Sequence, residues 1–181
     1  MTSAEEFTEF AVAALPRLRR TAFLLCGDWQ AAEDLTQATL AKVFVAWRRI
    51  SRRDAVFSYA TRTLANTYLA AQRRRRVTEL LTSRLPDRAA DPGTPELRMM
   101  VLDALAGLPP KARAVVVLRY WEDLSVEQVA VLLGCSTGNV KSQSARSLDK
   151  LRAVLGDAVT TADPQPPVRS RRPATGDQDY G

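Results

Sequence analysis

The residues with the clearest chemistry lie between 138 and 146, where side chains that recognise DNA bases recur at helical spacing. Read at 3.6 residues per turn, one side of this segment holds Asn139, Ser142, Gln143 and Arg146. Arginine, asparagine and glutamine are the side chains that form paired hydrogen bonds with base edges in the major groove of DNA. The other side is apolar and would pack on the protein through Val140, Leu148, Leu151 and Leu155. The pattern predicts a helix that reads DNA.

The segment before this helix contains the elements that would position it. Ser125 and Gln128 have the spacing of a capping box at a helix start. Gly134 stands where the chain must leave that helix through a left-handed conformation, and Ser136 can cap the next helix. Ala130 is small enough for the two helices to cross closely. These features together predict a helix-turn-helix. The alternative is an ordinary helical hairpin whose polar face is merely solvated.

The composition argues against an enzyme active site. The chain has 181 residues and no histidine, so the commonest general base and metal ligand is missing. The nearest acidic pairs, Glu33-Asp34 and Glu122-Asp123, fall on separate helical segments. We therefore predict no catalytic residue, no metal site and no cofactor. An enzyme acting on nucleic acid stays open as the weakest alternative.

A second basic region lies in the first half of the chain. The formal net charge is +6, and 22 of the 26 basic residues are arginine. From Lys42 to Arg76 there are ten basic residues and a single acid, Asp54. Nucleic acid is the natural counter-surface for such a segment, although a charge run is more often a solvated face. The candidate contacts are Arg52 and Arg53 in a basic loop over 49–54, followed by a helical stripe of Ser58, Arg62, Asn66 and Arg73.

Apolar periodicity and the absence of strand-like alternation predict an all-α fold. Helices are expected over 4–26, where Pro16 should start or kink one, from Trp29 to Arg49, from Asp54 to the arginines at 73–76, from Glu96, and from Lys111 to Trp121. We predict two small helical domains, 5–76 and 96–155, joined by a flexible linker at 77–95 that is rich in proline. Residues 156–181 are expected to be a disordered tail.

The helix expected from Trp29 to Arg49 has two different faces. Its core side should hold Trp29, Ala32, Leu40, Phe44 and Trp47. Asp34, Gln37 and Ala41 share the other side, which periodicity alone leaves open between solvent and a partner. No apolar run approaches the length of a membrane span, so we expect no membrane insertion. Cys26 and Cys135 lack metal-ligand spacing and are interpreted as buried thiols in a reducing cytoplasm.

Taken in order, these segments resemble the extracytoplasmic-function (ECF) sigma factors, the small two-domain class of bacterial sigma subunits of RNA polymerase. The resemblance covers roughly residues 5 to 155. The segment AEDLTQATLAKVFVAW is similar to the family's polymerase-binding segment, and SYATRTLANTYLAAQRRRR is similar to its promoter −10 helix. The stretch from LPPKARAVVVLRYWEDLS to the end of the helix-turn-helix is similar to its −35-binding domain.

The resemblance implies a role for each segment. Docking on the β′ clamp helices of core RNA polymerase would use Glu33, Asp34, Leu35, Gln37, Ala41, Phe44 and Trp47. The −10 element would be received by Arg52, Arg53, Ser58, Arg62, Asn66 and Arg73. The −35 element would be read by Gly138, Asn139, Lys141, Ser142, Gln143 and Arg146. The family also implies a cytoplasmic protein whose partners are core polymerase, promoter DNA and, where one exists, an anti-sigma factor.

The implied function is that of a specificity subunit, which directs core polymerase to promoters and leaves the chemistry to it. The alternative is a helix-turn-helix transcriptional regulator that never joins polymerase. Such a regulator would have no need of the block over 28–76, which therefore separates the two interpretations.

Overall fold

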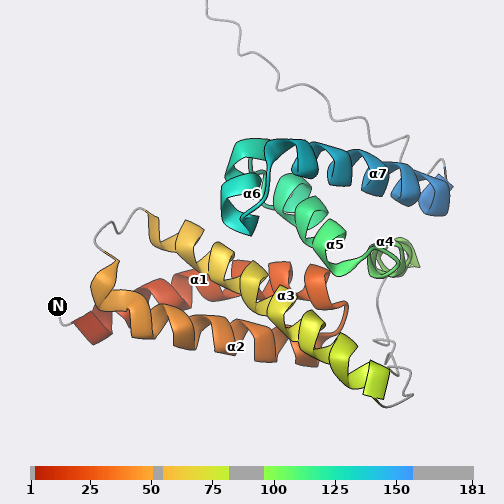
Figure 1. Cartoon of the computed structure of the whole chain (residues 1–181). Helices are drawn as coiled ribbons and strands as arrows, with labels where there is room; N and C mark the ends of the chain where they lie inside the picture. The colour runs from red at the N-terminus through yellow and green to blue at the C-terminus, as the bar shows by residue number, and fades with distance from the viewer. Residues whose placement is uncertain (1–2, 51–54, 82–95, 157–181) are drawn as a thin grey trace, which may run out of the picture.

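The computed structural model describes residues 3–50, 55–81 and 96–156, and its regular secondary structure over these ranges is entirely helical (Figure 1). The prediction of an all-α fold is confirmed. In the first half lie α1 (Ser3–Cys26), α2 (Trp29–Ala46), the 3-10 turn η1 (Trp47–Arg49) and α3 (Val56–Leu81). In the second half lie α4 (Glu96–Ala106), α5 (Pro110–Val116), the π-helical turn η3 (Val117–Trp121), α6 (Val126–Leu133) and α7 (Thr137–Leu155). We call α1–α3 the N-terminal bundle and α4–α7 the C-terminal bundle.

The helix ends follow the capping chemistry that the sequence predicts. The Asp28 carboxylate accepts a hydrogen bond from the backbone N–H of Ala31 at 2.7 Å and so caps α2. Ser125 and Gln128 form a reciprocal capping box at the start of α6. Gly134 ends α6 with φ 61° and ψ 46°, the left-handed conformation that glycine adopts without steric cost. The helix-turn-helix is therefore present with the expected boundaries.

Two details of the first and third helices differ from the expected ones. Pro16 neither starts nor ends a helix but lies inside α1, on its exposed side, where water can bond the carbonyl that the proline ring leaves free. The sequence predicts that the third helix ends at 73–76 and that the linker begins at 77, whereas α3 continues to Leu81. Arginine is a good helix former, so the basic run extends α3 rather than ending it. The rest of the expected linker, 82–95, and the expected tail beyond Gly156 lie outside the described residues.

The core side of α2 differs from the expected one. Its buried residues are Ala32, Leu35, Thr36, Thr39 and Val43. Phe44, which the sequence assigns to the core, is 53 % exposed because it follows Val43 just past the edge of the buried face. The buried hydroxyls of Thr36 and Thr39 donate to carbonyls one turn earlier, each at 2.7 Å. These local bonds satisfy the threonines and allow a polar residue type to line the core.

The two bundles pack on each other and share their cores, which the sequence does not predict. Ala114 of α5 and Val117 of η3 belong to the hydrophobic cluster of the N-terminal bundle. Conversely, Ala65 of α3 is fully buried in the cluster formed by the helix-turn-helix. Figure 1 shows α5 and α6 lying against the layer of α1 and α3. Small side chains allow this contact because they let helix backbones approach closely.

Polar contacts between the bundles reinforce the apolar ones. Glu122, at the end of η3, is only 5 % exposed and forms an ion pair with Arg17 of α1, with Nη2 and Oε2 2.7 Å apart. The Thr21 hydroxyl of α1 donates to the other carboxylate oxygen of Glu122. From α5, the Arg113 guanidinium donates to the Leu25 carbonyl at 2.8 Å. The contact between the bundles is thus both apolar and hydrogen-bonded.

The two cysteines are half-buried rather than fully buried. Burial raises the pKa of the Cys26 thiol from 9.0 to about 11. Between pH 9 and about 11 the Cys26 thiol ionises in the unfolded chain but stays protonated in the folded chain. Its contribution to the free energy of unfolding is therefore lost as the pH rises from 9 to about 11.

At pH 9, iodoacetamide should therefore modify Cys26 about fiftyfold more slowly in the native than in the unfolded protein. Peptide mass spectrometry measures the two rates, and equal rates would contradict this environment.

Candidate nucleic-acid interface

The helix α7 presents most of its expected base-reading side chains to solvent. Ser136 caps its start by accepting a hydrogen bond from the backbone N–H of Asn139 at 3.2 Å. Gly138, Asn139, Lys141 and Arg146 are exposed, whereas Ser142 and Gln143 are half-buried. Arg146 Nη2 donates to Ser142 Oγ at 2.6 Å, which lays the guanidinium along the outer side of the helix. A cation and several amide or hydroxyl groups therefore face outward together.

The inner side of α7 differs in part from the expected apolar face. Val140 and Leu155 are buried as expected, but Leu148 and Leu151 are only half-buried. Ser144 and Ser147 are buried instead. The serines have little volume, so α7 can lie close against α5 and α4. A periodicity search that counts only apolar residues misses such positions.

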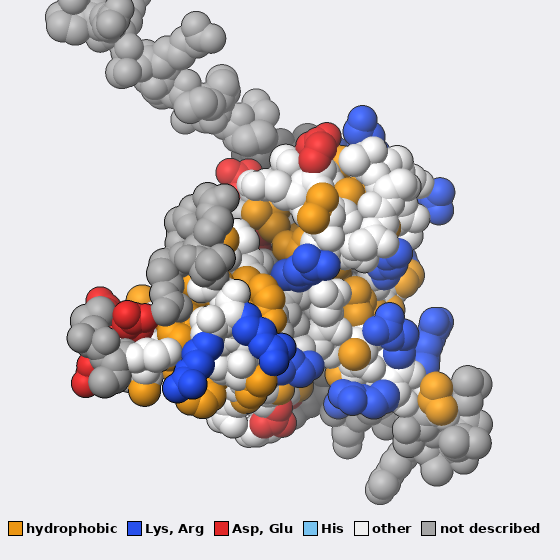
Figure 2. Space-filling view, turned by 60° about the vertical axis from the view of Figure 1, so that its left-hand side comes forward, with side chains coloured by type: hydrophobic (Ala, Val, Ile, Leu, Met, Phe, Trp, Pro, Cys, Tyr) orange, Lys and Arg blue, Asp and Glu red, His pale blue; other side chains and the backbone are white. Residues whose placement is uncertain are grey.

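The helix α3 presents its expected polar stripe on the surface. Ser58, Arg62, Asn66 and Arg73 are all exposed. Arg52 and Arg53, which the sequence groups with this stripe, lie outside the described residues. Figure 2 shows a face of the molecule on which Lys and Arg side chains predominate over Asp and Glu. The positive field of such a face attracts the phosphate backbone of nucleic acid.

A cavity of about 300 Å³ lies between α2 and α3 beside this stripe. Its lining residues are Lys42, Tyr59, Arg62, Thr63, Asn66 and Thr67. Lys42 Nζ donates to Thr67 Oγ1 at 2.9 Å, so the ammonium group is held at the cavity wall. The Tyr59 ring is 38 % exposed and offers an aromatic face. Cations, an amide and an aromatic ring are the groups that hold an unstacked nucleotide.

The sequence predicts only two of these lining residues, Arg62 and Asn66. Tyr59 and Thr63 share their helical face at spacings of three and four residues, so periodicity could have found them. Lys42 comes from α2, and no pattern within α3 could have indicated it.

The outer side of α2 forms a third surface. Asp34, Gln37 and Ala41 are exposed there, as the periodicity predicts, and so are Phe44 and Val45. Glu33 is half-buried and forms an ion pair with Arg19 of α1 at 2.7 Å. Leu35 and Trp47, which the family resemblance assigns to this surface, are 7 % and 3 % exposed. Both fill the core of the N-terminal bundle, so neither side chain lies on this outer surface.

Comparison with known proteins decides the family. The model of sigma-70 region 2 matches residues 11–78, and the model of sigma-70 region 4 matches residues 98–151. The RNA polymerase sigma-E factor of Streptomyces coelicolor is 38 % identical over 152 residues, which cover 83 % of this chain and 86 % of that protein. The chain belongs to the ECF sigma factors of the sigma-70 family. It is therefore an RNA polymerase sigma factor, a class of transcription initiation factor, and not a free-standing helix-turn-helix regulator.

Other sigma factors show the same relationship. The ECF RNA polymerase sigma factor SigE of Mycolicibacterium smegmatis is 34 % identical over 150 residues, covering 77 % of this chain and 57 % of that protein. Among solved structures, the complex of sigma factor RpoE with the anti-sigma factor NepR from Bartonella quintana has a TM-score of 0.69. That match is 24 % identical in sequence and covers 83 % of this chain and 97 % of the other, so it supports the sigma-factor fold. Over residues 3–50, 55–81 and 96–156, the structure contains no helix with the length and apolar character of a membrane span.

Proposed function

We propose that this sigma factor distributes its work over three surfaces. The outer face of α2 (Asp34, Gln37, Ala41 and Phe44) docks on the β′ clamp helices of core polymerase. The stripe on α3 and its cavity receive the −10 element, and the exposed side of α7 reads the −35 element. The polymerase supplies the active site, so the sigma factor itself needs no catalytic residue and no cofactor. It acts in the cytoplasm, where an anti-sigma factor is a further partner, as it is for the structural neighbour RpoE.

The observation that carries this proposal is the cavity between α2 and α3. Lys42 and Arg62 can neutralise phosphates, the Asn66 amide can pair with a base edge, and Tyr59 can stack on a base. A cavity of about 300 Å³ admits a base only after the base has left the duplex stack. Holding an unstacked base at this point would stabilise the melted DNA that initiation requires.

The two DNA-reading surfaces belong to separate modules in this proposal, α1–α3 (3–81) and α4–α7 (96–155), joined by residues 82–95. The −10 and −35 elements lie about 25 base pairs apart, or roughly 85 Å at ~3.4 Å per base pair. A compact body of about 140 residues has a radius of gyration of only about 14 Å. The bundles must therefore separate before both elements can be read at once. The tether then makes the second contact intramolecular, which raises the overall affinity.

Charge reversal on the outer face of α2 tests the polymerase contact. Asp34→Lys combined with Gln37→Lys should weaken binding to core polymerase at least tenfold, since like charges replace a complementary contact. Binding is measured by fluorescence anisotropy, with circular dichroism as the check on folding. The matched control is Thr8→Lys combined with Glu9→Lys, which makes the same change in net charge on the exposed side of α1. Unchanged binding by the α2 variant would refute this docking surface.

Alanine substitutions at the cavity test the −10 assignment. Arg62→Ala and Asn66→Ala should each slow open-complex formation about tenfold or more, since hydrogen bonds to charged groups contribute about 1.5–3 kcal/mol. Affinity for the −35 element should not change. Permanganate reactivity of unpaired thymines follows the open complex, and Arg20→Ala, at an exposed position on α1, is the control. A loss of −35 affinity with normal opening would reverse the assignment.

A further inference from the structure

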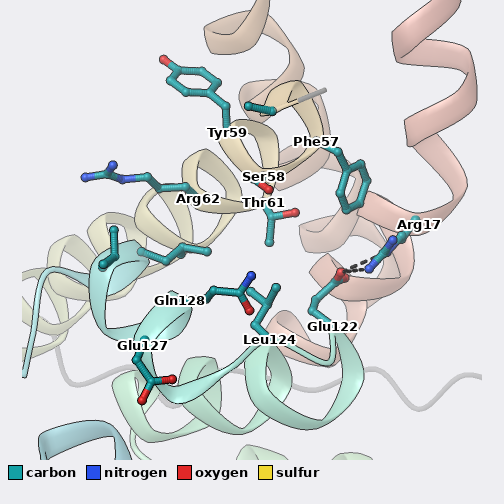
Figure 3. Close-up of a pocket in the computed structure, with 13 residues that line it drawn as sticks. Arg17, Phe57, Ser58, Tyr59, Thr61, Arg62, Glu122, Leu124, Glu127 and Gln128 are labelled. Atoms are coloured by element: carbon teal, nitrogen blue, oxygen red, sulfur yellow. Dashed lines mark hydrogen bonds and ion pairs between the residues drawn. The ribbon is translucent and has the colours of Figure 1, made fainter. Parts of the chain in front are cut away.

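A second cavity, of about 530 Å³, lies between the two bundles (Figure 3). Its walls come from Arg17 of α1, from Ala55 and the first two turns of α3, from the segment that joins η3 to α6, and from α6 itself. The apolar part of the lining includes Phe57 and Tyr59 from α3 and Leu124, Val131 and Leu132 from the C-terminal bundle. Its volume falls in the range of about 300–1,000 Å³ that is typical of sites for small molecules, which often form where domains meet.

One side chain in this cavity has an unmet hydrogen-bonding need. Thr61 is 3 % exposed, and no group in the described part of the chain bonds its hydroxyl. Buried hydroxyls in native proteins nearly always have a partner, so an orphan that lines a cavity indicates a missing one. A threonine in a helix can bond the carbonyl one turn earlier, as Thr36 and Thr39 do in α2, but Thr61 does not.

Other polar groups on the same wall are hydrogen-bond donors. The Gln128 Oε1 atom accepts from the backbone N–H of Ser125 at 2.7 Å, which orients the amide. Figure 3 shows the Gln128 nitrogen directed across the cavity toward Thr61, whereas the Arg62 side chain extends to the left, away from both, and Glu127 points away from the cavity. The Glu122 carboxylate at the far end is already bonded to Arg17 and Thr21. The groups available to a ligand would therefore favour a hydrogen-bond acceptor, and the positive charge of Arg62 at the cavity lining favours an acceptor that is negatively charged.

We propose that this cavity binds a small amphipathic molecule whose apolar body lies among Phe57, Leu124 and Leu132 and whose anionic end accepts hydrogen bonds from Thr61 and Gln128. A medium-chain carboxylate has this chemistry. Because α3 and α6 both contact the ligand, the site exists only while the bundles are packed together. Binding therefore stabilises the packed arrangement by mass action. This last effect rests on the proposed function, since reading both promoter elements requires the bundles to separate.

Decanoate is a suitable probe for the full-length protein. Titrated below its micelle concentration, it should shift backbone amide resonances of α3 and α6 together, saturably and with one molecule bound. Decyltrimethylammonium, which has the same chain and the opposite charge, should bind at least tenfold more weakly. Equal affinity for the two amphiphiles, or shifts that never saturate, would overturn the proposal.

Two substitutions test the location without disturbing the fold. Val131→Trp should fill the cavity and abolish saturable decanoate binding, because Val131 lines the cavity while its side chain is also 71 % exposed. Val12→Trp is the matched control, on α1 at 69 % exposure and outside the cavity lining. Thr61→Val keeps the shape and removes the hydroxyl, and it should weaken binding about tenfold. Binding that survives Val131→Trp would place the ligand elsewhere and refute the site.

The regulatory effect has its own readout. In promoter-directed transcription with core polymerase, decanoate should inhibit the wild type and Val12→Trp but not Val131→Trp. Without decanoate the three proteins should transcribe alike. Decanoate binding without inhibition would refute the stabilised packed state while leaving the site intact. Absence of transcription by all three proteins would count against the proposed function and not against the cavity, which the resonance shifts test independently.

Discussion

Replacing Arg113 with alanine is expected to lower the free energy of unfolding by about 2–4 kcal/mol, far more than the loss of an exposed arginine would. Arg113 is 9 % exposed, and its guanidinium donates to the carbonyls of Leu25 at 2.8 Å and of Ala106 at 2.6 Å. These carbonyls lie in the last turns of α1 and α4, where helices lack internal hydrogen-bond donors and carry partial negative charge. One cation therefore completes two helix ends, and its loss leaves the buried Leu25 carbonyl and the part-buried Ala106 carbonyl without their donor.

Urea denaturation followed by circular dichroism measures this effect. Arg20→Ala removes an exposed arginine from α1 and should change stability by no more than about 0.5 kcal/mol. Arg113→Lys keeps the charge but not the fork that reaches two acceptors, so it should recover only part of the loss. If Arg113→Ala proved as stable as Arg20→Ala, the guanidinium would have no structural role between the bundles.

Arg146→Ala should reduce promoter affinity by about 1–3 kcal/mol through a single base pair of the −35 element and relax the preference there. The structure places the guanidinium on the outer side of α7, supported by Ser142 at 2.6 Å. Lys141→Ala is the contrasting substitution, since an ammonium group favours a phosphate. It should weaken all promoters alike and make the dependence of log affinity on log salt shallower by about one unit.

Binding of polymerase reconstituted with each variant is measured on promoters that carry every base at each −35 position. The Arg146→Ala protein should lose its base preference at one −35 position. The Lys141→Ala protein should keep the wild-type preference at every position and bind all the promoters more weakly. A change of preference at the −10 element in the Arg146→Ala protein would contradict the assignment of α7 to −35 reading.

The features that sequence alone predicts are those set by neighbouring residues in the chain. Capping by Asp28 and Ser125 and the left-handed turn at Gly134 depend on local hydrogen bonds and backbone sterics, so their residue types identify them. The exposure of Arg62 and Asn66 follows from helical spacing in the same way. The outer positions of α7 are predictable for this reason, although the serines on its inner side are not.

The remaining features depend on which elements pack together. Ala65 and Thr61 are buried because α6 lies against α3, and helical periodicity within α3 has no access to that contact. Lys42 reaches the cavity beside α3 because two helices meet there. Periodicity assigns Phe44 to the core, but the buried position is the preceding residue, Val43. Each residue of a helix is rotated by about 100° from the one before, so an error of one position places the ring in solvent.

The small side chains at the contact between the bundles also bear on the cost of separating them. Ala65, Ala114 and Val117 are buried where the bundles meet, and each carries little apolar surface. If the bundles separate, the newly exposed faces show these small residues together with larger ones such as Leu24 of α1 and Leu102 of α4. At about 25 cal/mol per Å², each alanine or valine in such a face costs less to hydrate than a leucine or phenylalanine would. Alanine at these positions therefore lets the bundles pack closely in one state and lowers the cost of exposing the contact in the other.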